Sequence, residues 1–176
     1  SLYVGGGWEQ IFTPNLVGSL RGGLQQKSFD DEAVGDENAP YADISLTFLP
    51  SPKTRLSIGA GYSMFEADIT QYANQERMLT FLTLSHDLTA RIQLFAATSY
   101  QLSTYDLKQE VDPGDGSDAL AQTDGDENIF QASLRASYMV SRRNYVEASV
   151  QYLDFQSDLR NEFDRARLEL GWRTQL

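Results

Sequence analysis

Along most of the chain, apolar residues occupy every second position and small polar residues fill the positions between them. The segment 130–138 shows this pattern, with Phe130, Ala132, Leu134, Ala136 and Tyr138 alternating with Gln131, Ser133, Arg135 and Ser137. Successive side chains of a β-strand point to opposite faces of a sheet, whereas a helix has a longer repeat. The pattern therefore predicts an all-β protein.

The alternation divides the chain into nine predicted strands, joined by connections that are alternately short and long. The strands are predicted at 2–11, 16–28, 40–49, 55–67, 77–86, 91–106, 128–140, 144–157 and 163–175. The short connections lie at 13–15, 51–54, 87–90 and 141–143, and the longer ones at 30–40, 70–76, 109–127 and 158–162. Short turns on one rim and long loops on the other are typical of an outer-membrane barrel. We therefore expect residues 1–176 to form one domain, an antiparallel transmembrane β-barrel meander.

The two faces of the predicted strands differ in chemistry. The apolar set is even-numbered in nearly every strand, and the odd-numbered set consists mainly of Ser, Gly, Thr, Gln and Arg. A soluble sandwich packs bulky residues inside and carries Lys or Glu outside. Here the polar set is too small and too uncharged for a solvated exterior, so we interpret it as a lumen and the apolar set as a lipid-facing surface. A soluble sandwich or lipocalin-like barrel is the alternative, because the parity is broken by Leu79, Phe81, Phe95, Leu153 and Phe155.

Composition narrows the class further. No run of about 18 apolar residues exists, which excludes a membrane-spanning helix but not a spanning strand of about 9–11 residues. The net charge of −11 argues against nucleic-acid binding. The absence of Cys excludes a disulfide scaffold, a Cys-ligated zinc site and a thiol nucleophile. The single His, His86, adjoins a short connection, and we predict no enzymatic activity.

The number of strands bears on the extent of the barrel. Nine antiparallel strands would leave the first and the last parallel, and Ser1 leads directly into a predicted strand. Bacterial single-chain barrels have even strand numbers. We therefore expect the chain to be the C-terminal part of a larger even-stranded barrel, incomplete on its N-terminal side.

Arginines are the candidate functional residues, because seven of them share the odd parity of the predicted lumen. These are Arg21, Arg55, Arg91, Arg135, Arg165, Arg167 and Arg173, and the clear acids of the same parity are Glu9, Asp43, Glu147 and Glu169. Lipid contact is too costly for a guanidinium group, so inward placement is expected. The predicted lumen-lining set is Arg21, Arg55, Arg135, Glu147, Arg165, Arg167, Glu169 and Arg173. Such a lumen favours anions or an acidic polymer if arginines are in excess; the alternative is an interior that neutralises itself or is plugged.

Acidic residues gather in the longer connections, which hold or adjoin 20 of the 25 Asp and Glu residues. Lys53, Arg142 and Arg143 mark the short connections instead. We therefore expect the long acidic loops, including 112–127, to be extracellular and the C-terminus to be periplasmic.

One acidic connection has spacing that suits a calcium ion. Asp112, Asp115 and Asp118 lie among glycines and supply the oxygen ligands that Ca²⁺ prefers. The spacing of an EF-hand is absent, and a solvated loop is the alternative interpretation. No other cofactor is predicted.

The end of the chain carries a more specific motif. Outer-membrane barrels usually end with a targeting signal that consists of a polar residue, a Gly two positions later, an apolar residue three positions after the Gly, and a final aromatic residue. The segment Glu169-Leu170-Gly171-Trp172-Arg173-Thr174-Gln175-Leu176 matches the polar position, the Gly and the apolar terminus. It departs from the pattern at Thr174 and Leu176. We assign Glu169, Gly171, Trp172 and Leu176 to an assembly signal read by the outer-membrane assembly machinery.

The segment 144–176 resembles the putative β-barrel porin 2 group and barrels linked to exopolysaccharide operons. The resemblance rests on Tyr152-Leu153-Asp154-Phe155, Ser157-Asp158, Phe163-Asp164-Arg165 and Leu168-Glu169-Leu170-Gly171-Trp172. It implies a porin-like channel for small polar or anionic solutes in a bacterial outer membrane, in contact with lipid and lipopolysaccharide. A structural or docking barrel and an exopolysaccharide-export barrel are the alternatives, with other subunits or an export complex as partners.

Overall fold

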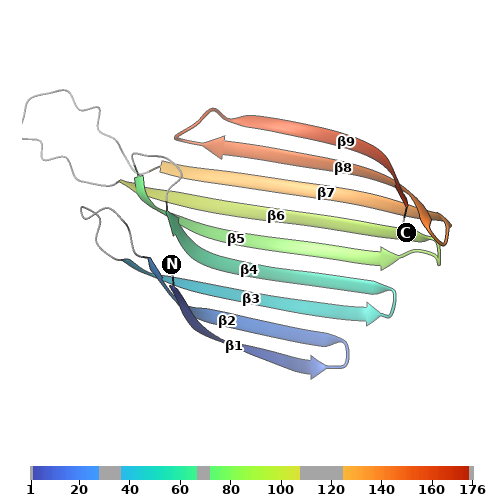
Figure 1. The fold of residues 1–176 in the computed structure, drawn as a ribbon, viewed down its shortest axis with the longest axis horizontal. Helices are drawn as coiled ribbons and strands as arrows, with labels where there is room; N and C mark the ends of the chain where they lie inside the picture. The colour runs from blue at the N-terminus through green and yellow to red at the C-terminus, as the bar shows by residue number, and fades with distance from the viewer. Residues whose placement is uncertain (1, 28–36, 67–71, 108–124, 175–176) are drawn as a thin grey trace, which may run out of the picture.

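The computed structural model describes residues 2–27, 37–66, 72–107 and 125–174. These residues form nine strands and no helix (Figure 1). The strands are β1 (Leu2–Thr13), β2 (Leu16–Lys27), β3 (Glu37–Ser51), β4 (Thr54–Glu66), β5 (Tyr72–Asp87), β6 (Ile92–Leu107), β7 (Gly125–Ser141), β8 (Asn144–Ser157) and β9 (Phe163–Thr174). Within these ranges there is accordingly no helix long and apolar enough to cross a membrane.

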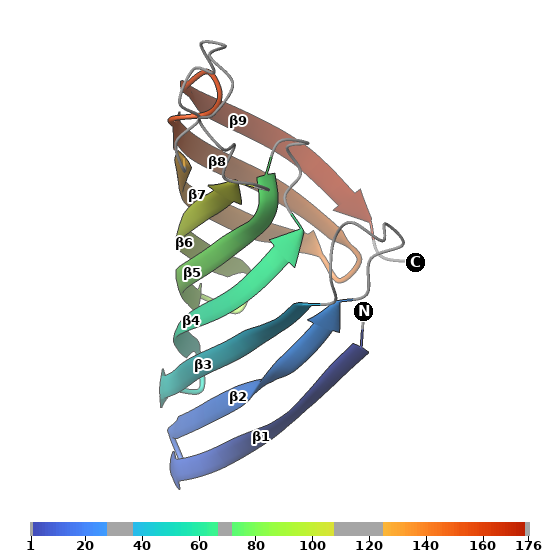
Figure 2. The same cartoon turned by 90° about the vertical axis from the view of Figure 1, so that its left-hand side faces the viewer.

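The nine strands build one antiparallel sheet in which each strand pairs with its neighbours along the chain. Figure 2 shows the sheet curving in the direction of the strand order, with β1 and β9 at the two ends of the arc. Over the described residues the sheet stays open, because β1 and β9 pair only with β2 and β8. The prediction of an all-β antiparallel meander of nine strands is confirmed, whereas the larger even-stranded barrel stays a prediction.

The register of the sheet keeps odd and even positions apart. In each of the eight pairings, even-numbered residues lie opposite even-numbered ones, as Leu46 lies opposite Ile58 and Ile58 opposite Leu82. The exceptions are irregularities at strand ends, such as Ser51 opposite Thr54 beside a short turn. Because side chains alternate along every strand, one parity covers one whole face of the sheet.

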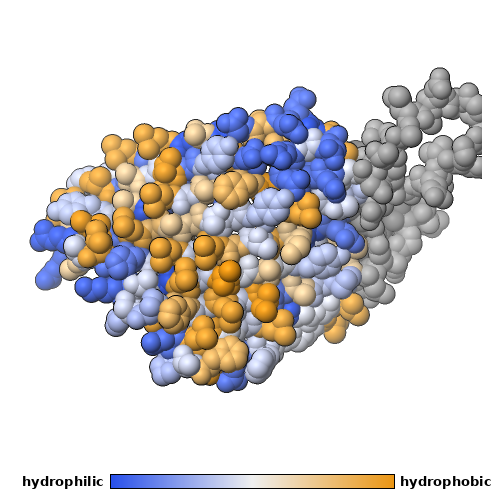
Figure 3. Space-filling view, turned by 180° about the vertical axis from the view of Figure 1, so that it is seen from behind, coloured by the Kyte–Doolittle hydropathy of each residue, from blue (hydrophilic) through white to orange (hydrophobic). Residues whose placement is uncertain are grey.

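The convex face carries the even-numbered residues and is apolar. All but five of the exposed large hydrophobic side chains are even-numbered, and Leu168 and Leu170 are 81% and 80% exposed. Figure 3 shows this face, with apolar side chains spread over the middle of the sheet. The residues predicted to face outward lie here, namely Ile44, Leu46, Ile58, Leu94, Leu134, Val150, Leu168 and Leu170. A face this apolar and this exposed suits the interior of a bilayer better than water.

Aromatic residues border the apolar surface at both strand ends. Phe12, Phe48, Tyr138 and Trp172 lie near the short turns, and Tyr62, Tyr100, Phe130 and Tyr152 lie toward the longer connections. Along β9 the surface runs from Asp164 to Thr174. Ten steps of about 3.3 Å from residue to residue, tilted by about 40°, span roughly 25 Å, the height of the lipid-facing band of an outer-membrane barrel.

Several strands extend beyond the bounds that the sequence pattern predicted. The prediction began β3 at 40, β5 at 77 and β7 at 128, whereas they begin at Glu37, Tyr72 and Gly125. The added residues are mostly polar, so the alternation of apolar residues alone places them in the connections. Strand pairing continues past the apolar band, because backbone hydrogen bonding does not require apolar side chains.

Candidate functional site: the concave face

The predicted lumen arginines that lie on strands project from the concave face. Arg21 lies on β2, Arg55 on β4, Arg135 on β7, and Arg165, Arg167 and Arg173 lie on β9, all at odd positions. Arg91 differs from the prediction, because it precedes the first residue of β6 and belongs to a short turn. Whether the concave face is the lumen of a closed barrel stays a prediction.

Two of these arginines are paired. Arg173 Nη2 lies 2.8 Å from Glu147 Oε1, and the guanidinium carbon of Arg173 lies 4.8 Å from the ring centre of Tyr145. Arg167 Nη2 lies 2.6 Å from Glu169 Oε1. These pairs are partly exposed, so each contributes little to stability. Their effect is to cancel the charge of β9 at two of its three arginines.

The remaining four arginines of the predicted set have no carboxylate within ion-pair distance among the described residues. They are Arg21, Arg55, Arg135 and Arg165. Asp43 lies opposite Arg21 in the register of β2 and β3 without forming an ion pair with it. The concave face thus retains unpaired positive charge between its strands, as the anion-favouring hypothesis requires.

A trough crosses the concave face from β5 to β9. Two consecutive rows of the sheet register form it, Phe81–Ser99–Gln131–Leu153–Arg165 and Thr83–Ala97–Ser133–Gln151–Arg167. All ten residues line one hollow of about 320 Å³. Small residues of β6 and β7 form the floor, Phe81 lies at one end and the two arginines of β9 lie at the other.

A buried polar network occupies the concave face near the longer connections. Glu127 is 3% exposed and Tyr105 is 1% exposed. The Tyr105 hydroxyl donates to Glu127 Oε2 at 2.7 Å and accepts from Gln75 Nε2 at 2.8 Å. Arg160 Nε lies 2.9 Å from Glu127 Oε1, and Ser157 Oγ donates to the same oxygen at 3.1 Å. We call Gln75, Tyr105, Glu127, Ser157 and Arg160 the rim network.

The rim network fixes the connection between β8 and β9. The backbone amides of Leu159 and Arg160 donate to Ser157 Oγ at 3.0 and 3.1 Å. A Cβ at Gly125 would meet the side chain of Leu159, which therefore packs directly against this glycine. The connection is therefore packed against the start of β7.

Sequence reasoning missed the members of the rim network and Arg77. The sequence pattern places Glu127 in the acidic connection 109–127, whereas the residue lies in β7 with the odd parity of the concave face. Arg77 is odd-numbered and lies in β5, so the parity rule alone was enough to place it inward. Its guanidinium carbon lies 4.5 Å from the ring centre of Phe65, and Nη2 donates to Gln75 Oε1 at 3.2 Å.

The other residues that the sequence analysis singled out do not line the trough. His86 is at the short-turn end of β5, where Nδ1 and the Thr54 hydroxyl are 2.9 Å apart across β4 and β5. Glu169 and Gly171 of the assembly signal have the concave parity and Trp172 lies on the convex face, while Leu176 lies outside the described residues. The calcium candidates Asp112, Asp115 and Asp118 also lie outside them.

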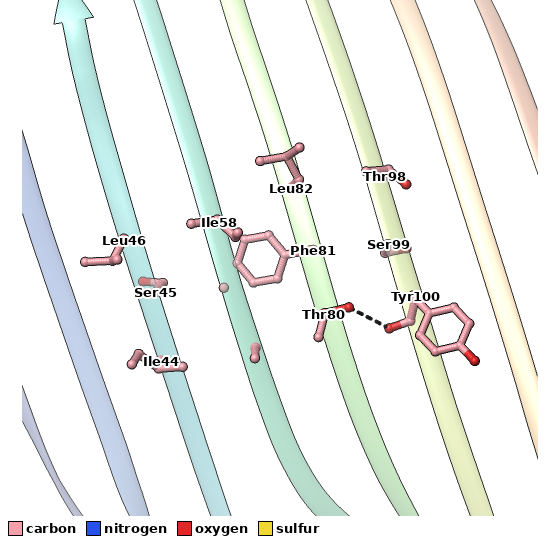
Figure 4. Close-up of a pocket in the computed structure, with 12 residues that line it drawn as sticks. Ile44, Ser45, Leu46, Ile58, Thr80, Phe81, Leu82, Thr98, Ser99 and Tyr100 are labelled. Atoms are coloured by element: carbon pink, nitrogen blue, oxygen red, sulfur yellow. Dashed lines mark hydrogen bonds between the residues drawn. The ribbon is translucent and has the colours of Figure 1, made fainter.

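The convex face has a hollow of its own, which suits no polar solute. Its volume is about 430 Å³, and its side chains are mostly apolar, among them Ile44, Leu46, Ile58 and Leu82 (Figure 4). The hydroxyl of Thr80 donates a hydrogen bond to the backbone carbonyl of Tyr100 at 3.4 Å, so its proton is already engaged within the sheet. The polar and charged side chains that could contact a solute therefore lie on the concave face.

A match to a known protein family is consistent with the antiparallel sheet of nine strands. The sequence profile of a family described as "Putative beta-barrel porin 2" matches residues 1–176. A search of curated proteins finds no match.

Proposed function

Because the chain belongs to the putative beta-barrel porin 2 family of outer-membrane barrels, we propose that its concave face lines a channel for the passive passage of small polar and anionic solutes. Membership of this family supports a porin-like role and an outer-membrane location. The preference for anions and the orientation in the membrane are parts of the proposal.

One observation carries the preference for anions. Arg21, Arg55, Arg135 and Arg165 have no ion-pair partner in the described part of the chain, whereas Glu147 and Glu169 are already paired with arginines. Of the four acids predicted to share this face, only Glu9 and Asp43 are left without an ion pair there, so the unpaired arginines outnumber them. Positive charge on a low-dielectric wall attracts anions and repels cations. A lumen of this kind needs no catalytic group, because the solute moves down its own gradient.

The orientation follows from the two kinds of connection. The short turns carry Lys53, Arg142 and Arg143, and the acidic residues adjoin the longer connections. In outer-membrane barrels the short turns lie in the periplasm. We propose that the longer connections face outside, where divalent ions would bridge their carboxylates to lipopolysaccharide, and that the C-terminus is periplasmic, where the assembly machinery reads it.

A second candidate function is a structural or docking barrel with a filled interior. The rim network supports it, together with Phe155 and Phe163, whose rings stack at 5.1 Å on the same face. Both groups narrow the concave side near the longer connections. A partner such as an export complex would then bind the outer rim.

Liposome swelling separates the two functions. Full-length protein is folded into liposomes that contain a large dextran, and the liposomes are diluted into isotonic solutions of sugars of increasing size. A channel gives swelling rates that fall with solute size. Swelling no faster than that of protein-free liposomes would reject the channel and favour the docking barrel.

A further inference from the structure

The trough between β5 and β9 has the shape of a binding subsite. Its two rows cross five strands, which corresponds to about 19 Å along the wall at a strand spacing of about 4.8 Å. The hollow of about 320 Å³ exists because the middle of the rows is built from small side chains, Ala97, Ser99 and Ser133. A uniformly lined wall would have no such depression.

The two ends of the trough offer different chemistry. Phe81 leans from β5 toward β4, because Gly59 lies opposite it and has no side chain (Figure 4). The same ring borders the β5 end of the hollow, where it is an apolar group. At the other end Arg165 has no carboxylate partner among the described residues, while the Glu169 carboxylate contacts Arg167 at 2.6 Å. Arg165 is therefore the guanidinium group of the trough that is available to an anion.

Amide groups lie between these ends. Gln131 and Gln151 line the trough and project from the same face as Ser99 and Ser133. Neither glutamine side chain has a hydrogen-bond partner among the described residues. Amides donate and accept hydrogen bonds, so they suit hydroxyl groups, whereas an arginine fork suits a carboxylate.

We propose that the trough binds a sugar acid, a solute that combines a carboxylate, several hydroxyls and an apolar ring face. Arg165 binds the carboxylate, Gln131 and Gln151 bind hydroxyls, and the C–H face of the sugar packs on Phe81. The inference rests on the proposed channel function and adds a solute class to it. A weak site of this kind concentrates the solute in the channel without trapping it.

The test uses channel block by glucuronate, with glucose and acetate as comparison solutes. Full-length protein is inserted in a planar bilayer, and the current in dilute chloride is followed as each solute is added. Glucuronate is expected to reduce the current at concentrations at which glucose and acetate do not, because neither of them offers both the carboxylate and the hydroxyls. Equal block by glucuronate and acetate would overturn the proposal.

Two variants with the same change of charge locate the site. Arg165→Gln is expected to weaken glucuronate block about tenfold, the effect of losing one charge-assisted interaction. Arg55→Gln removes an equally unpaired concave arginine outside the trough and is expected to leave the block within about twofold of the parent. An equal loss in both variants would show that the general field of the wall attracts glucuronate, and the subsite would be rejected.

Calorimetric titration of glucuronate into the detergent-folded protein separates this proposal from the proposed function. Binding that Arg165→Gln weakens, in a protein that conducts no ions, would refute the channel and keep the subsite. Conductance without glucuronate binding would support the channel and refute the subsite. Loss of binding in Phe81→Leu with unchanged acetate affinity would support the role of the ring.

Discussion

The ring of Phe81 lies over Gly59, its partner across β4 and β5. A Cβ at Gly59 would lie 2.6 Å from two ring carbons of Phe81 and 2.8 Å from the backbone carbonyl oxygen of Ile44. An aromatic side chain packed on a cross-strand Gly pins the register of the pair. The same contact sets the position of Phe81 at the end of the trough, so local packing and the concave site are coupled.

We predict that Gly59→Ala lowers the free energy of unfolding by about 1–3 kcal/mol, the cost of adding a methyl group to a packed position. The ring can move, but the carbonyl oxygen belongs to the backbone of β3 and cannot. Urea titration of the protein in lipid vesicles measures the change. Gly171→Ala is the matched control, because a Cβ there meets no atom within 4 Å. Equal stability of the two variants would contradict the packing role of Gly59.

The rim network is expected to depend on the charge of Glu127. Glu127→Gln keeps the size of the side chain but removes the ionic partner of Arg160 and one of the acceptors of a buried cluster. Because Arg160 is 42% exposed, the expected loss is moderate, about 1–2 kcal/mol in the free energy of unfolding. Asp126→Asn is the control, since Asp126 is the exposed neighbour of Glu127 on the other face. A loss no larger than that of the control would count against the network.

The two faces are expected to differ in their tolerance of charge. Val150→Arg places a guanidinium group on the convex face and is expected to cost about 2–4 kcal/mol in lipid. Ser149→Arg changes the adjacent residue on the concave face, beside Glu169, and is expected to cost little. Urea-dependent folding into vesicles measures both. Similar costs at the two positions would refute the assignment of the convex face to lipid.

Membrane orientation can be tested by single cysteines, because the chain has no Cys of its own. Asn161 lies in the connection between β8 and β9, and Lys53 lies in the short turn between β3 and β4; both are exposed. We predict that a membrane-impermeant maleimide labels Asn161→Cys on intact cells. Lys53→Cys should react only after the outer membrane is opened. The opposite order would reverse the proposed orientation.

Much of the architecture could be predicted because one rule governs the whole sheet. The register joins even to even positions in all eight strand pairs, so the parity of Leu134 or Arg135 in the sequence already assigns each to a face. The pair of Arg167 and Glu169 follows from the same rule, because residues two apart share a face. Phe81 is odd-numbered and lies in the same register row as Ser99 and Gln131, so it shares the polar face although its apolar side chain departs from the chemical pattern.

The remaining features depend on information that alternation does not carry. The contact of Arg173 with Glu147 requires the register of β8 and β9, which the length of their connection does not determine. Glu127 was misplaced because β7 begins within an acidic segment, where no apolar residue marks the strand. The trough requires the curvature of the sheet as well as the sizes of side chains on five strands.

The most direct test of the account is the reversal potential of the full-length protein in a planar bilayer under a salt gradient. Unpaired arginines on the concave face predict a potential whose sign indicates anion preference. The preference should diminish toward 1 M salt, where screening acts over about 3 Å. A preference for cations, or the absence of any conductance, would contradict the proposal of an anion-favouring channel and favour the docking barrel.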